Sequence, residues 1–146
     1  MFKVSSLSPN IPALDYTADA SIAYTNGDLL YRNTSNGEVV AAASTTVSTV
    51  NIEAICQSTE TTAASSPTIR AIPIVSGMLV EADCDSSTAA NQLNKAHLIN
   101  DTGATVVNTD THVGTSAAVF IALKIIGATT DKKLLGYFVK VGQVTA

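Results

Sequence analysis

The sequence predicts an all-β protein: a compact β-sandwich or barrel of short antiparallel strands, with an extended N-terminal arm and at most one short helix. Two apolar runs rich in β-branched residues, at 119–126 and 134–141, flank a polar link at 127–133, as in a β-hairpin. Other short apolar runs alternate with turn residues, and no long helical pattern separates them. A chain of 146 residues suits one domain with its own core.

The hairpin at residues 119–141 is the expected centre of the core. Because side chains alternate between the faces of a strand, one face of its first strand is wholly apolar. That face carries Val119, Ile121, Leu123 and Ile125. Phe120 and Ile126 make the other face partly apolar, so we expect this strand to be buried on both sides.

Residues 1–20 are expected to form an N-terminal arm, followed by a single β-rich domain at residues 21–146. Pro9 and Pro12 block regular ladder pairing and favour extended backbone. The arm nevertheless carries many apolar side chains, which a solvated tail would not need. These are Phe2, Val4, Leu7, Ile11, Leu14 and Tyr16. The arm therefore either packs across its own domain or docks on another subunit.

The domain is expected to begin with a hairpin whose turn contains Asn36-Gly37, a strong hairpin-turn pair. Alternation at residues 51–57 places Ile52, Ala54 and Cys56 on one face. Strands are expected at residues 29–32, 38–42, 51–57, 68–74 and 78–84, a short helix at 85–95, a second hairpin at 96–108 and a polar loop at 109–116.

The charge of the chain is low and unevenly distributed. Only 14% of its residues are charged, about half of the usual share, and the net charge is −4. Residues 1–118 carry four basic and eleven acidic side chains, whereas residues 119–146 carry four lysines and one acid. Broad nucleic-acid binding is disfavoured, because neutralising phosphates requires clustered basic residues. The basic hairpin is expected either to be solvated or to contact an acidic partner or a neighbouring subunit.

No catalytic or metal site is evident in the sequence, so we expect neither an enzyme nor a cofactor. A nucleophile needs a base with an orienting partner, and the only histidines are His97 and His112. Asp110 and His112 lack a supporting ligand pair, so a polar turn is expected there. Cys56 and Cys84 show no zinc-ligand spacing; buried thiols are expected, with a disulfide as the alternative.

Neither a secretory signal nor an apolar run of membrane-spanning length is found in the sequence. We therefore expect a protein that is made in a cytoplasm and has no membrane partner.

Several features of the chain occur together. A proline-containing arm is followed by GDLLYR…NGEVV, then by IRAIPIVSGMLVEAD and NQLNKAHLINDTGATVVN, and the chain ends in the strand pair VFIALKIIGA…KLLGYFVKV. In this layout the chain resembles the head decoration (capsid cement) proteins of tailed bacteriophages. The resemblance implies a non-enzymatic virion protein, made in the host cytoplasm. Such a protein stabilises the outer capsid surface by bridging subunits of the major capsid protein, commonly as a homotrimer.

The resemblance also nominates contact residues by their position. Candidate capsid contacts in the arm are Phe2, Val4, Leu7, Ile11 and Leu14, and candidate subunit contacts in the hairpin are Lys124, Lys132 and Lys133. A head-fibre or tail structural component is the first alternative. A small ligand-binding β-sandwich is a weaker one, because the chain has no Trp, only four Tyr and three Phe to line a pocket.

Overall fold

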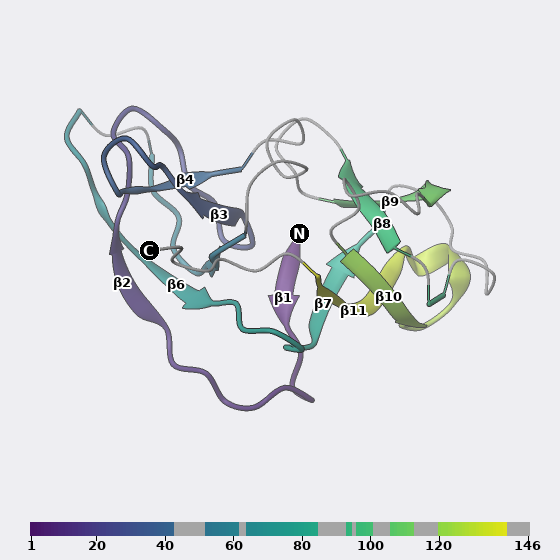
Figure 1. Cartoon of the computed structure of the whole chain (residues 1–146). Coiled ribbons are helices and arrows are strands. Elements are labelled where there is room, and N and C mark those ends of the chain that lie inside the picture. Colours follow the sequence, from purple (N-terminus) through teal and green to yellow (C-terminus); the bar gives the residue numbers. More distant parts are fainter. Residues whose placement is uncertain are drawn as a thin grey trace.

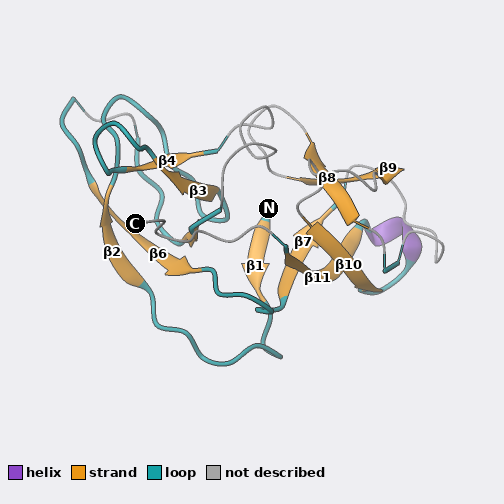
Figure 2. Ribbon diagram, viewed as in Figure 1, coloured by secondary structure: helices purple, strands orange, loops and turns teal. Residues whose placement is uncertain are grey.

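The computed structural model describes residues 1–42, 52–61, 64–84, 93–94, 96–100, 106–112 and 120–139. This part of the chain is nearly all β and forms two antiparallel sheets, which confirms the predicted fold class (Figure 2). Its only helical element is a 3-10 turn, η2 (Thr129–Asp131). Most of the segment expected as a helix, residues 85–95, lies outside the described residues. Among the described residues, no helix is both long enough and apolar enough to cross a membrane.

In the view of Figure 1, the five-stranded sheet lies to the left of β1, and the other strands of the six-stranded sheet, to which β1 belongs, lie to its right. The six-stranded sheet has the order β1 (Phe2–Val4), β7 (Val80–Asp83), β11 (Lys133–Phe138), β10 (Phe120–Ile125), β8 (Ala96–Asn100) and β9 (Val106–His112). The five-stranded sheet has the order β2 (Leu14–Thr17), β6 (Thr68–Pro73), β5 (Ala54–Cys56), β3 (Leu29–Arg32) and β4 (Val39–Ala41).

Each sheet is so strongly curved that two strands that are not neighbours in its strand order come into contact. Ala18, just after β2, bridges to Val39 in β4, and Cys84, just after β7, bridges to Val107 in β9. The five-stranded sheet thereby encloses its own small core around Tyr24, whose hydroxyl donates to the carbonyls of Asp19 (2.9 Å) and Val39 (3.2 Å). In the six-stranded sheet the bridge joins β7 to β9, so β1 remains an edge strand.

A larger core joins the two sheets. Its most prominent members are the three phenylalanines of the chain, Phe2, Phe120 and Phe138. Their ring centroids lie 5.3 to 6.3 Å apart, within the range of favourable aromatic pairs. The five-stranded sheet contributes Leu29 and Ile55, both fully buried. The same sheet therefore buries apolar side chains on both of its faces.

The segment expected as an N-terminal arm is built into the domain. β1 pairs with β7 and β2 pairs with β6, so the first seventeen residues supply an edge strand to each sheet. Pro9 and Pro12 lie between these strands, outside any ladder, as their missing backbone N–H groups require. Of the two expected arrangements, the structure has the one in which the segment packs on its own chain.

The hairpin of β10 and β11 is confirmed, but the prediction of its core-facing side chains was wrong. Phe120 and Ala122 are fully buried, whereas Leu123 is exposed. The core face before residue 123 is that of Phe120 and Ala122, which leaves Ile121 and Leu123 on the opposite face. A bulge follows, because Ala122 pairs with Gly136 and Lys124 with Leu135, so Leu123 has no partner in the register. Beyond the bulge the alternation is reversed, and Ile125 joins the core face.

The remaining expectations are mostly confirmed. β3 and β4 form the first hairpin, β8 and β9 the second, and β6 and β7 lie where strands were expected. Two corrections concern faces and loops. Ile52 belongs to the larger core and not, as expected, to the face of Ala54 and Cys56, and residues 109–112 continue β9 instead of forming a loop. Cys56 and Cys84 are buried and form no disulfide.

Gly136 offers a test of the packing beneath the phenylalanine rings. A Cβ at this position would approach the Phe120 ring to 2.5 Å and would also collide with the carbonyl oxygen of Ile121. Gly136→Ala should therefore lower the free energy of unfolding by about 1–3 kcal/mol, the usual cost of overpacking. Urea denaturation measures this. Val139→Ala, at an exposed position next to β11, should change it by less than about 0.5 kcal/mol. Equal effects would contradict the packing described here.

Candidate interaction surfaces

The N-terminal segment is anchored by a buried aromatic side chain. Phe2 is 1% exposed and packs between Phe120 and Phe138, and its backbone N–H donates to the carbonyl of Gly27. Gly27 permits this close approach because it has a φ of +94° and no side chain; a Cβ there would collide with Met1. Phe2 is therefore corrected from a candidate capsid contact to a core residue.

A turn at residues 5–8 fixes the chain beyond β1. The Ser5 N–H donates to the Leu79 carbonyl (2.9 Å), and the Ser8 hydroxyl both accepts from the Leu79 N–H (2.6 Å) and donates to the Leu79 carbonyl (3.1 Å). Leu7 projects from this turn with 71% of its surface exposed. Val75, in the neighbouring β6–β7 connection, is 48% exposed. An apolar side chain is thus presented to solvent on an ordered backbone.

The other arm candidates differ in exposure. Val4 and Ile11 are partly buried and pack against the larger core, which leaves each of them little surface for a partner. Leu14, at the start of β2, is 49% exposed. Of the five nominated arm residues, Leu7 and Leu14 therefore have the largest exposed fractions.

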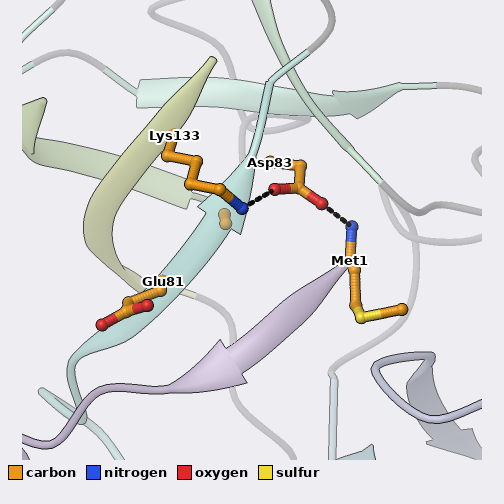
Figure 3. Close-up of a pocket in the computed structure, with 5 residues that line it drawn as sticks. Met1, Glu81, Asp83 and Lys133 are labelled. Atoms are coloured by element: carbon orange, nitrogen blue, oxygen red, sulfur yellow. Dashed lines mark hydrogen bonds and ion pairs between the residues drawn. The ribbon is translucent and has the colours of Figure 1, made fainter. Parts of the chain in front are cut away.

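The nominated lysines lie near the β10–β11 connection but differ in their contacts. The Lys133 ammonium binds one carboxylate oxygen of Asp83 (2.8 Å), and the α-amino group of Met1 binds the other (3.1 Å), as Figure 3 shows. Lys132 has a left-handed backbone (φ 55°), and its carbonyl accepts the N–H of Cys84 (2.8 Å). Lys124 is exposed on β10, opposite Leu135.

The ion-pair network sets the charge state of Asp83. Partial burial acts to raise the pKa of this carboxyl, but the hydrogen bonds from Lys133 and the α-amino group outweigh it, so the pKa lies below its ordinary value. The hydrogen bond with Asp83 in turn raises the pKa of Lys133. Both groups are therefore charged throughout the physiological pH range.

This network lines a shallow recess formed by Met1, Glu81, Ala82, Asp83 and Lys133 (Figure 3). Its charged groups neutralise one another, and it contains no nucleophile with an adjacent base. Over the described residues, no group of three or more His, Cys, Asp or Glu side chains is placed to hold a metal ion. The recess is thus an ion-pair site on the margin of β1.

The strand register brings together the backbone positions of the two histidines. His97 in β8 lies directly opposite His112 in β9, and His97 is also opposite Phe120 in β10. These are the only histidines of the chain. Nothing in the sequence indicated this pairing, because the second hairpin was expected to end at residue 108 and His112 to lie in a loop.

No protein-family model and no curated protein sequence matches the chain.

Asp83→Asn tests the network at the β1 margin. The substitution should lower the free energy of unfolding by less than about 1 kcal/mol at neutral pH, because the pairs are partly exposed. The pKa of Asp83 is depressed in the folded state, so its contribution is present above the ordinary carboxyl pKa and is lost as pH falls below about 4. The difference between variant and wild type should therefore decrease below about pH 4 and vanish once the pH is below the lowered pKa of the folded state.

Urea denaturation between pH 7 and pH 3 measures this dependence. Asp15→Asn is the matched control, because Asp15 also pairs with a basic side chain, Arg70, but on the other sheet. A difference for Asp83→Asn that persists unchanged at acid pH would contradict the assignment.

Proposed function

We propose that this chain is a structural virion protein that decorates the outer surface of a phage capsid and stabilises it by bridging subunits of the major capsid protein. The resemblance in layout motivates the proposal, and an all-β fold without a catalytic arrangement in its described part is compatible with it. In this proposal the chain acts as a homotrimer and needs no cofactor.

One observation carries the proposal: the distribution of exposed large apolar side chains. Over the described residues these fall into two groups. Met1, Leu7, Leu14 and Val75 belong to the N-terminal segment and the turn beside it, and Leu123 and Val139 belong to the β10–β11 hairpin. These are the two regions that the sequence nominated for capsid and subunit contacts. A chain that bridges a lattice and also self-associates needs two sets of contact residues, and we assign one group to each contact.

Stabilisation of a capsid then follows from mass action. A protein that binds the assembled lattice but not its separated subunits shifts the equilibrium towards the assembled state. Joining several copies in one oligomer raises the effective concentration of each further contact. Leu7 suits the first contact, because its turn is already ordered and little conformational entropy is lost on binding.

Leu7→Asp should weaken binding to expanded capsids by about tenfold or more, because burying a leucine contributes about 1.5–3 kcal/mol. Cosedimentation of the purified chain with capsids that lack decoration protein measures this. Leu7 is exposed, so the variant should unfold at nearly the same urea concentration as wild type.

Ser35→Asp is the control for capsid binding, since Ser35 is also exposed but lies in the β3–β4 turn, outside both nominated regions. Binding that is unaffected by Leu7→Asp would remove the N-terminal segment from the interface. A wild-type chain that does not bind capsids but forms elongated trimers in solution scattering would favour a head-fibre or tail component.

Lys124→Glu tests the hairpin as the subunit contact, because Lys124 is exposed on β10. The reversed charge should shift native mass measurements from trimer towards monomer, and the shift should be greatest at low salt. Arg70→Glu, the same change of charge on the other sheet, should leave the trimer intact. An unchanged trimer for Lys124→Glu would leave the hairpin with a core role only.

A further inference from the structure

Residues 1–8 form one unit whose backbone pairs with β7 and its neighbouring turn, while Phe2 packs on Phe120 and Phe138 and donates to Gly27. We call this segment the N-terminal unit. Its ladder pairs Phe2 with Ala82, Lys3 with Glu81 and Val4 with Val80. Beyond the ladder, Ser5 and Ser8 bind the backbone of Leu79. In Figure 1, β1 runs beside β7 at the margin of the six-stranded sheet.

The five residues that follow, 9–13, connect the N-terminal unit to β2 without hydrogen bonds to the rest of the described chain. Two of them, Pro9 and Pro12, favour a stiff, extended backbone. Among the five, Ile11 packs against the larger core. An exchange would use this connection as its hinge, because a change of its backbone direction breaks only one apolar contact, that of Ile11.

The site on β7 is complementary to the N-terminal unit of this same sequence. It provides the Phe120 and Phe138 rings for Phe2, the ladder positions 80–82 for β1, and the Leu79 backbone groups for Ser5 and Ser8. An identical unit from a second copy would meet every one of these features. The segment that fits best is therefore one with the sequence MFKVSSLS.

We propose that the N-terminal unit exchanges between copies of this chain, so that residues 1–8 of one copy pair with β7 of the next. Exchange reproduces all contacts of the unit and changes only the hinge, which makes it an energetically inexpensive route to an oligomer. The intramolecular arrangement prevails in dilute solution, and exchange becomes favourable where copies are held at high local concentration. Phe2 of one copy then completes the core of its neighbour.

Exchange requires β1 to leave the sheet, which withdraws the buried Phe2 from the phenylalanine core of its own copy until Phe2 of the other copy replaces it. The opening is at the margin of the sheet, because β1 is three residues long and no further strand covers its outer edge in the described sheet. The proposal needs only self-association and does not depend on the capsid function proposed above.

The test joins two chains by a disulfide across the β1–β7 ladder. One population carries Lys3→Cys and the other Glu81→Cys, since these positions are paired and face away from the core. The two are mixed at high concentration, incubated, oxidised and separated under non-reducing conditions. Exchange predicts a covalent dimer that contains one chain of each kind.

Three controls make each outcome decisive. A chain with both substitutions should form the bridge readily within dilute monomers, which shows that the geometry permits it. Lys3→Cys mixed with Lys124→Cys, whose cysteine is exposed but lies on β10, should yield no covalent dimer above background. Wild type, whose Cys56 and Cys84 are buried, sets that background.

Bridges that form only within chains carrying both substitutions would overturn the proposal, and so would a double variant that does not form the bridge at all. Capsid cosedimentation of the wild-type chain is scored separately. A chain that binds capsids without exchange retains the proposed function and loses this inference. A chain that exchanges without binding capsids retains this inference and loses the proposed function.

Discussion

The contact among three phenylalanines is the interaction on which the rest of the structure depends. Phe2 comes from the first strand of the chain, and Phe120 and Phe138 come from the hairpin more than a hundred residues later. Neither part can bury its rings alone, so the core between the sheets forms only when both have reached β7. Contacts of such long sequence separation are typical of slowly folding β proteins.

This arrangement also determines what the molecule presents to a partner. Strands β1 and β2 hold the N-terminal segment at two points, and the serine turn at Leu79 holds it at a third. Leu7 is therefore exposed without being mobile, which is the condition under which an apolar contact contributes most to affinity. The hairpin, by contrast, combines a buried face with exposed Leu123 and Lys124.

Local patterns predicted the strands, because apolar alternation and turn pairs such as Asn36-Gly37 act over a few residues. What they missed depends on partners distant in sequence. The core takes the Phe120 and Ala122 face of β10 because Phe2 and Phe138 lie there, and the bulge at Leu123, which brings Ile125 to that face, arises from the register with β11. Phe2 was expected to contact the capsid, since nothing nearby shows that its pocket lies in the hairpin. The pairing of His97 with His112 likewise follows only from strand order.

The fully buried Tyr24 gives the five-stranded sheet a spectroscopic signature of its own. The chain has no tryptophan, so its near-ultraviolet absorption comes from four tyrosines, of which Tyr24 alone is completely enclosed. Desolvation raises the pKa of Tyr24 to about 12. In alkali, ionisation of the Tyr24 phenol should accompany opening of the bridge between Ala18 and Val39. Tyrosinate absorbance would therefore report on the five-stranded sheet, whereas phenylalanine rings do not ionise and give no such signal.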